Sequence, residues 1–214
     1  MKTACFGLAA VAAAGVATTT SAAQISDVDT FTGSVPSTLN VTLDQFDDLG
    51  GTLTLTSVQL IVQTDISADV TGENDSNSSG QLTLNLSGSA NATFGGLDAT
   101  ALVNLSEGPI SVGASDGTPD SGPDFHDFGN VIGSDDADDL IISGFSPFIG
   151  TGTISVPVDI SGGFTITGVT DSSLSVSNFQ STGSVEVIYD YVPEPASAIL
   201  MGAGLLCLSR RRRA

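Results

Sequence analysis

A period-two alternation of apolar and polar residues constrains the fold of this chain more than any other feature. It is clearest in "STLNVTLDQF" (37–46) and "QLTLNLSG" (81–88), where leucine and valine alternate with threonine, serine and asparagine. Successive side chains of a β-strand point to opposite faces of the sheet. The pattern therefore predicts strands with one buried face and one solvated face.

The same pattern predicts further strands at 51–70, 90–95, 98–105, 151–159, 163–170, 173–179 and 183–191. Within the first of these, the apolar phase shifts at Thr56-Ser57, which predicts a β-bulge. Many short strands without a helical pattern between them predict an all-β fold. We expect an antiparallel β-sandwich of the jelly-roll type, flanked by an N-terminal signal-peptide helix and a C-terminal apolar helix.

The charges of this chain are separated along the sequence. All five basic residues lie at the ends (Lys2 and Arg210 to Arg213), and all 24 acidic residues lie between them. Such a body repels nucleic acid, because binding to phosphates depends on Lys and Arg. Two interpretations remain open, namely solubility and attraction of cations.

The N-terminus has the order of a secretory signal. Lys2 precedes an apolar stretch from Ala4 to about Ala17, and small residues at Ser21 and Ala23 fit a signal-peptidase site. We therefore expect residues 1–23 to be removed, leaving a body at 24–191. This body has no cysteine, because Cys5 and Cys207 both lie in the terminal segments.

The C-terminal segment, 192–214, combines Pro193-Glu194-Pro195, an apolar run from Ala196 to Leu208, and the basic cluster Arg210, Arg211, Arg212 and Arg213. As a helix, the apolar run would cover about 20 Å, short of a hydrocarbon core of about 30 Å. The arginines follow the run, so the positive-inside rule places them in the cytoplasm and the acidic body outside. We expect a transient membrane anchor.

These three parts together resemble the PEP-CTERM sorting signal of exported bacterial proteins. The resemblance implies that an exosortase, a membrane enzyme, recognises Pro193, Glu194 and Pro195 and transfers the body to a surface acceptor. It also implies that Arg210 to Arg213 retain the tail in the cytoplasm during processing. The expected route is export across the inner membrane, transient anchoring there, and a final place at the cell surface or outside it.

The body resembles the choice-of-anchor type E domain in three segments: "LDQFDDLGGTLTLTSVQLIV" (43–62), "FSPFIGTGTISVPV" (145–158) and "VEVIYDY" (185–191). Members of that family carry one β-domain joined to alternative surface anchors. The resemblance implies a single exported β-domain, and it brings neither an activity nor catalytic residues.

A calcium site is the best candidate for chemistry in the body. Ca²⁺ takes six to eight oxygen ligands, often from acidic loops interrupted by glycine. The segment 116–139 is predicted to be such a loop, although its spacing matches neither an EF-hand nor a nonapeptide repeat. The candidate ligands for a weakly bound Ca²⁺ are Asp116, Asp120, Asp124, Asp127, Asp135, Asp136, Asp138 and Asp139. No other cofactor is expected.

An enzyme is not expected. The single histidine, His126, is interpreted as a solvated turn residue, and no Gly-x-Ser-x-Gly motif accompanies it. We expect a structural or adhesive component of the cell envelope or of an extracellular polysaccharide matrix. A Ca²⁺-dependent carbohydrate-binding module is the first alternative, and a secreted hydrolase using paired carboxylates is the second.

Overall fold

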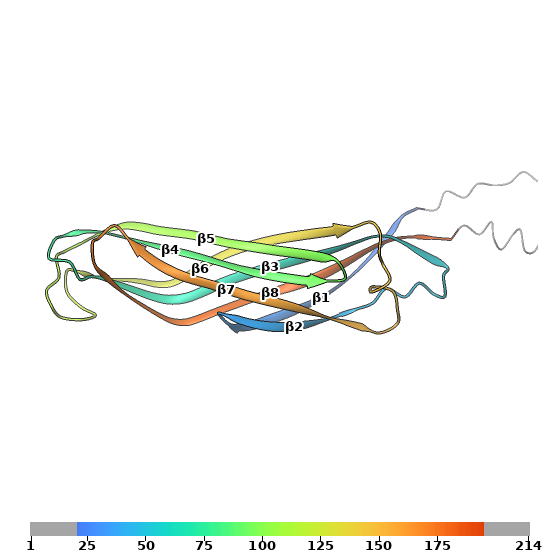
Figure 1. Cartoon of the computed structure of the whole chain (residues 1–214), viewed down its shortest axis with the longest axis horizontal. Coiled ribbons are helices and arrows are strands. Elements are labelled where there is room, and N and C mark those ends of the chain that lie inside the picture. The colour runs from blue at the N-terminus through green and yellow to red at the C-terminus, as the bar shows by residue number, and fades with distance from the viewer. Residues whose placement is uncertain (1–20, 195–214) are drawn as a thin grey trace, which may run out of the picture.

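The computed structural model describes residues 21–194, which form two four-stranded antiparallel sheets packed face to face (Figure 1). The predicted all-β fold is confirmed. The two predicted terminal helices fall on residues outside this range, and within 21–194 no helix is long and apolar enough to cross a membrane. The strands are β1 (Ala23–Ser34), β2 (Ser37–Asp44), β3 (Leu53–Asn74), β4 (Gly80–Phe94), β5 (Leu97–Val112), β6 (Phe125–Ile141), β7 (Thr153–Thr167) and β8 (Ser172–Pro193).

The strands pair in a nested order. Sheet A has the order β1-β8-β3-β6, and sheet B has the order β2-β7-β4-β5. The first strand thus pairs with the last, the second with the seventh, the third with the sixth, and the fourth with the fifth. This is the order that results when one long hairpin is rolled up so that alternate pairs enter opposite sheets.

The two ends of the sandwich differ in what they hold. β1 begins beside the end of β8, where Ala23 pairs with Tyr191, and both chain ends leave the molecule there (Figure 1). We call this the proximal end; loops 45–52, 95–96 and 142–152 also lie there. The distal end is formed by loops 75–79, 113–124 and 168–171.

Most predicted strands are present, and several are longer than predicted. The predicted strands 151–159 and 163–170 are both parts of β7, and 173–179 and 183–191 are both parts of β8. Gly162 does not turn the chain in β7: a Cβ there would stand 3.1 Å from the carbonyl oxygen of Ser87 in the paired strand β4, so glycine permits close approach. The bulge predicted at Thr56-Ser57 is confirmed, because the β3–β8 register shifts between Leu55 and Ser57.

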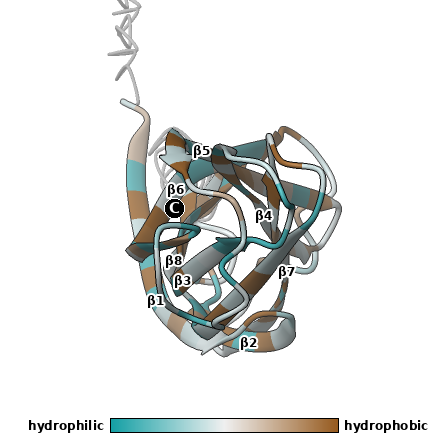
Figure 2. Ribbon diagram, turned by 90° about the vertical axis from the view of Figure 1, so that its left-hand side faces the viewer, coloured by the Kyte–Doolittle hydropathy of each residue, from teal (hydrophilic) through white to brown (hydrophobic). Residues whose placement is uncertain are grey.

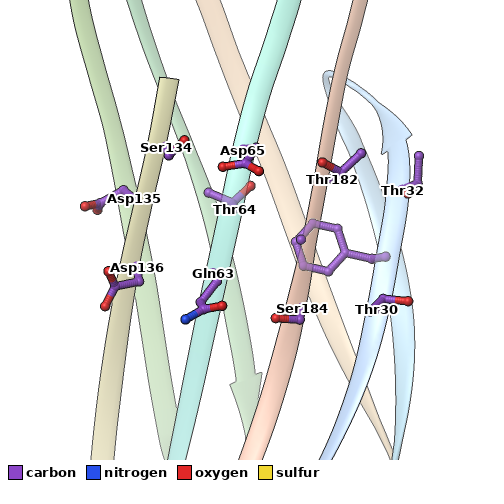
Figure 3. A pocket seen from close by; sticks show the side chains of 12 residues that line it. Thr30, Thr32, Gln63, Thr64, Asp65, Ser134, Asp135, Asp136, Thr182 and Ser184 are labelled. Carbon is purple, nitrogen blue, oxygen red and sulfur yellow. The ribbon is translucent and has the colours of Figure 1, made fainter. Parts of the chain in front are cut away.

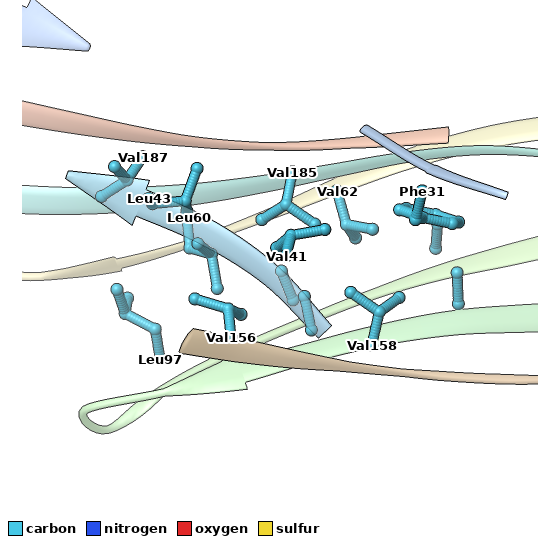
Figure 4. Packing of buried hydrophobic residues seen from close by; sticks show 14 of the residues in the cluster. Phe31, Val41, Leu43, Leu60, Val62, Leu97, Val156, Val158, Val185 and Val187 are labelled. Carbon is cyan, nitrogen blue, oxygen red and sulfur yellow. The ribbon is translucent and has the colours of Figure 1, made fainter. Parts of the chain in front are cut away.

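The core fills the space between the inner faces of the sheets. Alternating hydrophobic and hydrophilic residues along the strands are visible in Figure 2, and the inward side chains interlock in Figure 4. Val41, Leu60 and Val158, one from each of three strands, are completely buried. Burying each such side chain contributes about 1.5–3 kcal/mol. A smaller cluster that includes Val70 and Val131 lies toward the distal end.

Two edges of the sandwich are closed by aspartates that bind the backbone of the facing sheet. Where β1 meets β2, Asp27 and Asp29 accept hydrogen bonds from the backbone N–H groups of Asp44 and Thr42, at 2.7 and 2.8 Å. These N–H groups belong to an edge strand of sheet B and have no strand neighbour on that side. We call this contact the β1–β2 seam.

The second seam uses the same chemistry on the other side of the molecule. Asp135 and Asp139 of β6 accept hydrogen bonds from the N–H groups of Leu102 and Asp98 in β5, at 2.6 and 2.9 Å. This β5–β6 seam joins the remaining edge of sheet A to the remaining edge of sheet B. Both pairs of edge strands are therefore joined by carboxylates, without any lysine or arginine in the described chain.

Asp29 and Asp139 occupy equivalent positions in the two seams. In each, one carboxylate oxygen binds the facing strand and the other accepts the N–H of the next residue, Thr30 or Leu140. Hydrogen bonds to a carboxylate favour its charged form. The bond from Thr42, followed by that from Thr30, accordingly holds the pKa of Asp29 below its usual value.

Candidate functional site

A polar groove crosses the outer face of sheet A. It has a volume of about 660 Å³ and takes residues from all four strands of the sheet. Figure 3 shows how their side chains line it. The outward-facing residues are Thr30 and Thr32 from β1, Thr182 and Ser184 from β8, Gln63 and Asp65 from β3, and Ser134 and Asp136 from β6.

The floor of the groove is formed where an inward aromatic side chain passes under a glycine. Phe31 of β1 is buried and pairs in register with Gly183 of β8. A Cβ on Gly183 would stand 2.5 Å from the Phe31 ring, so no other residue fits there without a shift. Short side chains on the outer face above this point leave the groove open.

Hydrogen bonding within the protein leaves the groove side chains free, as it does other surface hydroxyls such as those of Thr165 and Ser175. None of the eight outward side chains forms a hydrogen bond with another described residue, whereas most aspartates elsewhere do. For example, Asp69 on the same face accepts bonds from Asn178 and Asn130, in that order of effect, and its pKa is lowered. Five hydroxyls, one amide and two carboxylates are thus available in the groove for a ligand.

The eight aspartates predicted to bind Ca²⁺ do not lie on one loop. Asp116, Asp120 and Asp124 belong to the loop between β5 and β6, but β6 begins at Phe125 and carries the other five. Because residues of a strand are spaced about 3.3 Å apart, Asp127 and Asp139 lie roughly 40 Å apart along β6. The prediction of one acidic loop over 116–139 is therefore wrong.

The five aspartates of β6 have separate surroundings. Asp127 accepts the N–H of Gly129, and Asp138 accepts a bond from Gln59 at 2.8 Å. Asp135 and Asp139 belong to the β5–β6 seam, and Asp136 faces the groove. Among residues 21–194, no group of three or more His, Cys, Asp or Glu side chains is placed to hold a metal ion.

His126 is interpreted from the sequence as a turn residue, but the structure places it in a strand. It lies in β6, in register with Gly72, and its ring meets that of Phe128 edge to face at 4.7 Å between centroids. The ring is half-buried by this contact. His126 is therefore a strand residue packed against Phe128.

The sorting motif begins inside the folded body. Pro193 is the last residue of β8 and pairs with Leu53, so the sandwich extends beyond the predicted boundary at 191. Glu194 is also held, since its N–H donates to the carbonyl oxygen of Thr52 at 2.8 Å and its Oε1 accepts a bond from Thr54 at 2.9 Å. Pro195 and Arg210 to Arg213 lie outside the described residues.

The last strand of this acidic β-sandwich leads directly into a Pro-Glu-Pro segment at 193–195. The comparison with protein families specifies the signal: residues 192–213 match the PEP-CTERM protein-sorting motif. The motif indicates sorting by an exosortase-type system, with export and membrane-anchored transit before surface display. An exosortase-type enzyme is thus a processing partner of this chain.

No curated protein matches the chain. Two solved structures, titled as infectious bursal disease virus of the Gt strain and of the Gx strain, align at 11% and 12% identity with TM-scores of 0.13 and 0.14. The alignments cover 96% and 91% of this chain but 53% and 48% of the viral chains, so the chain spans about half the length of each.

Proposed function

We propose that the exported body acts without catalysis, as an adhesive and structural component of the cell envelope or of an extracellular polysaccharide matrix, and that it binds polysaccharide in the groove of sheet A. The observation that carries this proposal is the set of eight uncommitted polar side chains across four strands. Most other outward aspartates are paired within the protein, whereas the two in the groove, Asp65 and Asp136, are not.

The chemistry of the groove favours an uncharged, hydroxyl-rich polymer. Hydroxyl, amide and carboxylate groups all exchange hydrogen bonds with sugar hydroxyls. Asp65 and Asp136 would repel an anionic chain, since the described residues contain no lysine or arginine to offset them. Without an aromatic platform, each contact is weak, and many copies on one surface would raise the overall strength by multivalency.

We further propose that the body is a choice-of-anchor type E domain with the jelly-roll arrangement. The nested strand order supports the second part. For the first, the three resembling segments meet at the proximal end: Phe46 forms an isolated bridge with Ile149, and its ring lies 5.7 and 5.2 Å from those of Tyr189 and Tyr191. Segments far apart in sequence thus form one packing unit.

The test is a binding measurement on the exported protein, with exopolysaccharide from its native host immobilised and with a panel of neutral and anionic glycans. The groove variants Gln63→Ala and Asp65→Ala should each weaken binding about tenfold, the size expected from one lost hydrogen bond to a well-placed polar group. Asp159→Ala is the matched control, because this exposed aspartate lies on sheet B.

Equal losses in the groove variants and in Asp159→Ala would contradict the proposed groove, because they would indicate a general charge effect. Release of reducing ends during incubation would support the hydrolase instead. Binding to anionic glycans alone would contradict the predicted ligand class.

A further inference from the structure

One aspartate at the distal end is buried with an unpaired carboxylate oxygen. Asp124 immediately precedes β6, and its exposed fraction is 0%. Its Oδ2 accepts a hydrogen bond from the backbone N–H of Asp116 at 2.9 Å, but its Oδ1 has no hydrogen-bond partner among the described residues. Burying a charged oxygen without a partner is unfavourable. A positive charge beside Asp124 Oδ1 would therefore stabilise the folded state.

The carboxylate of Asp116 faces the same point. Its Oδ1 accepts the N–H of Thr118 at 2.8 Å, which leaves Oδ2. Gly122 has a φ of 97°, and a Cβ on it would overlap Asp116 Oδ2 and stand 2.9 Å from Asp124 Oδ1. The two remaining oxygens therefore converge on the space beside Gly122, which a larger residue would fill.

No basic side chain is available to neutralise this pair of carboxylates. The sequence has no lysine or arginine between Gln24 and Ser209. Two neighbouring carboxylate charges repel each other, and a cation between them removes this repulsion. Carboxylate oxygens are ligands for hard divalent cations, and Ca²⁺ completes its shell with backbone carbonyls and water.

We propose that Ca²⁺ binds beside Gly122, with Asp124 Oδ1 and Asp116 Oδ2 as its two carboxylate ligands. The loop 113–124 supplies carbonyl oxygens, and water completes the shell. The heavy atoms nearest to this point all belong to Asp116 and Asp124, so the site uses neither Asp120 nor the five aspartates of β6. It is separate from the groove, so Ca²⁺ fastens the distal loop and does not take part in polysaccharide binding.

The test is thermal unfolding of the full exported protein with and without Ca²⁺, supported by calorimetric titration with CaCl₂. Extracellular modules bind Ca²⁺ with dissociation constants of about 10⁻⁴–10⁻³ M. At about 10 mM Ca²⁺, binding to the native state alone should raise the melting temperature by about 3–8 °C. Asp116→Asn should lower the affinity at least tenfold and thereby reduce the rise to about half or less; Asp124→Asn should do the same.

Asp120→Asn is the matched control, because it removes the same charge from the same loop. It should keep the full Ca²⁺ response. Asp116 is exposed, so Asp116→Asn keeps the proposal falsifiable if Asp124→Asn does not fold. A similar rise with NaCl at equal ionic strength, or equal losses in the Asp116 and Asp120 variants, would overturn the proposal in favour of charge screening.

The Ca²⁺ site and the polysaccharide groove can each be disproved without affecting the other. Polysaccharide binding that survives EDTA, together with a Ca²⁺-dependent melting temperature, is the result expected if both are correct. A protein that binds polysaccharide but gives no calorimetric signal with CaCl₂ would overturn the Ca²⁺ site alone.

Discussion

The two ends of the sandwich are closed by opposite kinds of chemistry. At the proximal end, aromatic rings fill the space between the sheets: Phe46 lies against Tyr189, and Phe94 meets Phe148 edge to face at 5.3 Å. At the distal end, the loops are anchored by two buried polar residues, Asn74 and Asp124, both 0% exposed. The same sandwich is therefore closed by apolar packing at the end where the chain enters and leaves, and by hydrogen bonds at the opposite end.

This difference should appear first in the response to truncation. Phe148 is completely buried, and Phe148→Ala should lower the free energy of unfolding by about 3–5 kcal/mol. Chemical denaturation, followed by tyrosine fluorescence and circular dichroism, measures this change. Phe148→Leu, which keeps most of the volume, should lose clearly less. A loss below about 1 kcal/mol for the alanine variant would show that the proximal end is not packed as described.

The stability of the distal end should depend strongly on one side-chain amide, that of Asn74. Asn74 donates to the carbonyl oxygen of Ser78 at 2.9 Å and to that of Gly113, and its Oδ1 accepts the N–H of Ser76. Asn74→Ala leaves these groups unpaired and should lower the free energy of unfolding by about 2–3 kcal/mol.

Hydrogen exchange gives the more specific measurement for Asn74→Ala. Amides of loops 75–79 and 113–124 should lose protection, while those at the proximal end keep it. Uniform loss of protection along all eight strands would contradict the independence of the two ends.

The smallest expected effect concerns the β1–β2 seam and its dependence on pH. The pKa of Asp29 is lowered in the folded protein, chiefly by the N–H of Thr42, so its charged form stabilises the fold. This stability is present above the unfolded pKa of about 3.9 and is lost as the pH falls through the lower folded value. Asp29→Asn should therefore lower the melting temperature slightly at neutral pH, on the order of 1 °C for so exposed a group.

The difference between wild type and Asp29→Asn should shrink as the pH falls below about 4. Melting temperatures measured across this range test the sign. A gap that grows with acidification would mean that the carboxylate of Asp29 does not accept these bonds in solution. Asp159→Asn serves as the control, because it removes the same charge from β7, outside both seams.

Much of the fold could be predicted from alternation, and the two strands that were missed share one physical reason. β1 and β6 are the edge strands of sheet A, and both turn aspartates toward the facing sheet, at Asp29 and Asp139. They also expose apolar residues such as Val28 and Leu140. A pattern that assumes apolar residues inside and polar residues outside cannot identify strands whose inward carboxylates bind backbone N–H groups.

The candidate sites were predictable only in part. Composition identified an acidic segment, and Asp116 and Asp124 were among the predicted ligands. However, local sequence does not show which carboxylates are already bound by the protein: Asp135 is, whereas Asp136 is not. The groove had no sequence signal at all, because it unites outward residues from Thr30 to Ser184 that become neighbours only through the sheet order.

The position of β8 has a mechanical consequence. It is an inner strand of sheet A, paired with β3 from Ser172 to Pro193 and with β1 from Gln180 to Tyr191, and its final residues lead to the sorting segment. A pull on that end, along the strand, loads both ladders in shear, so that many hydrogen bonds resist together instead of opening one after another. The chain thus leaves the domain through an inner strand that is held on both sides between Gln180 and Tyr191.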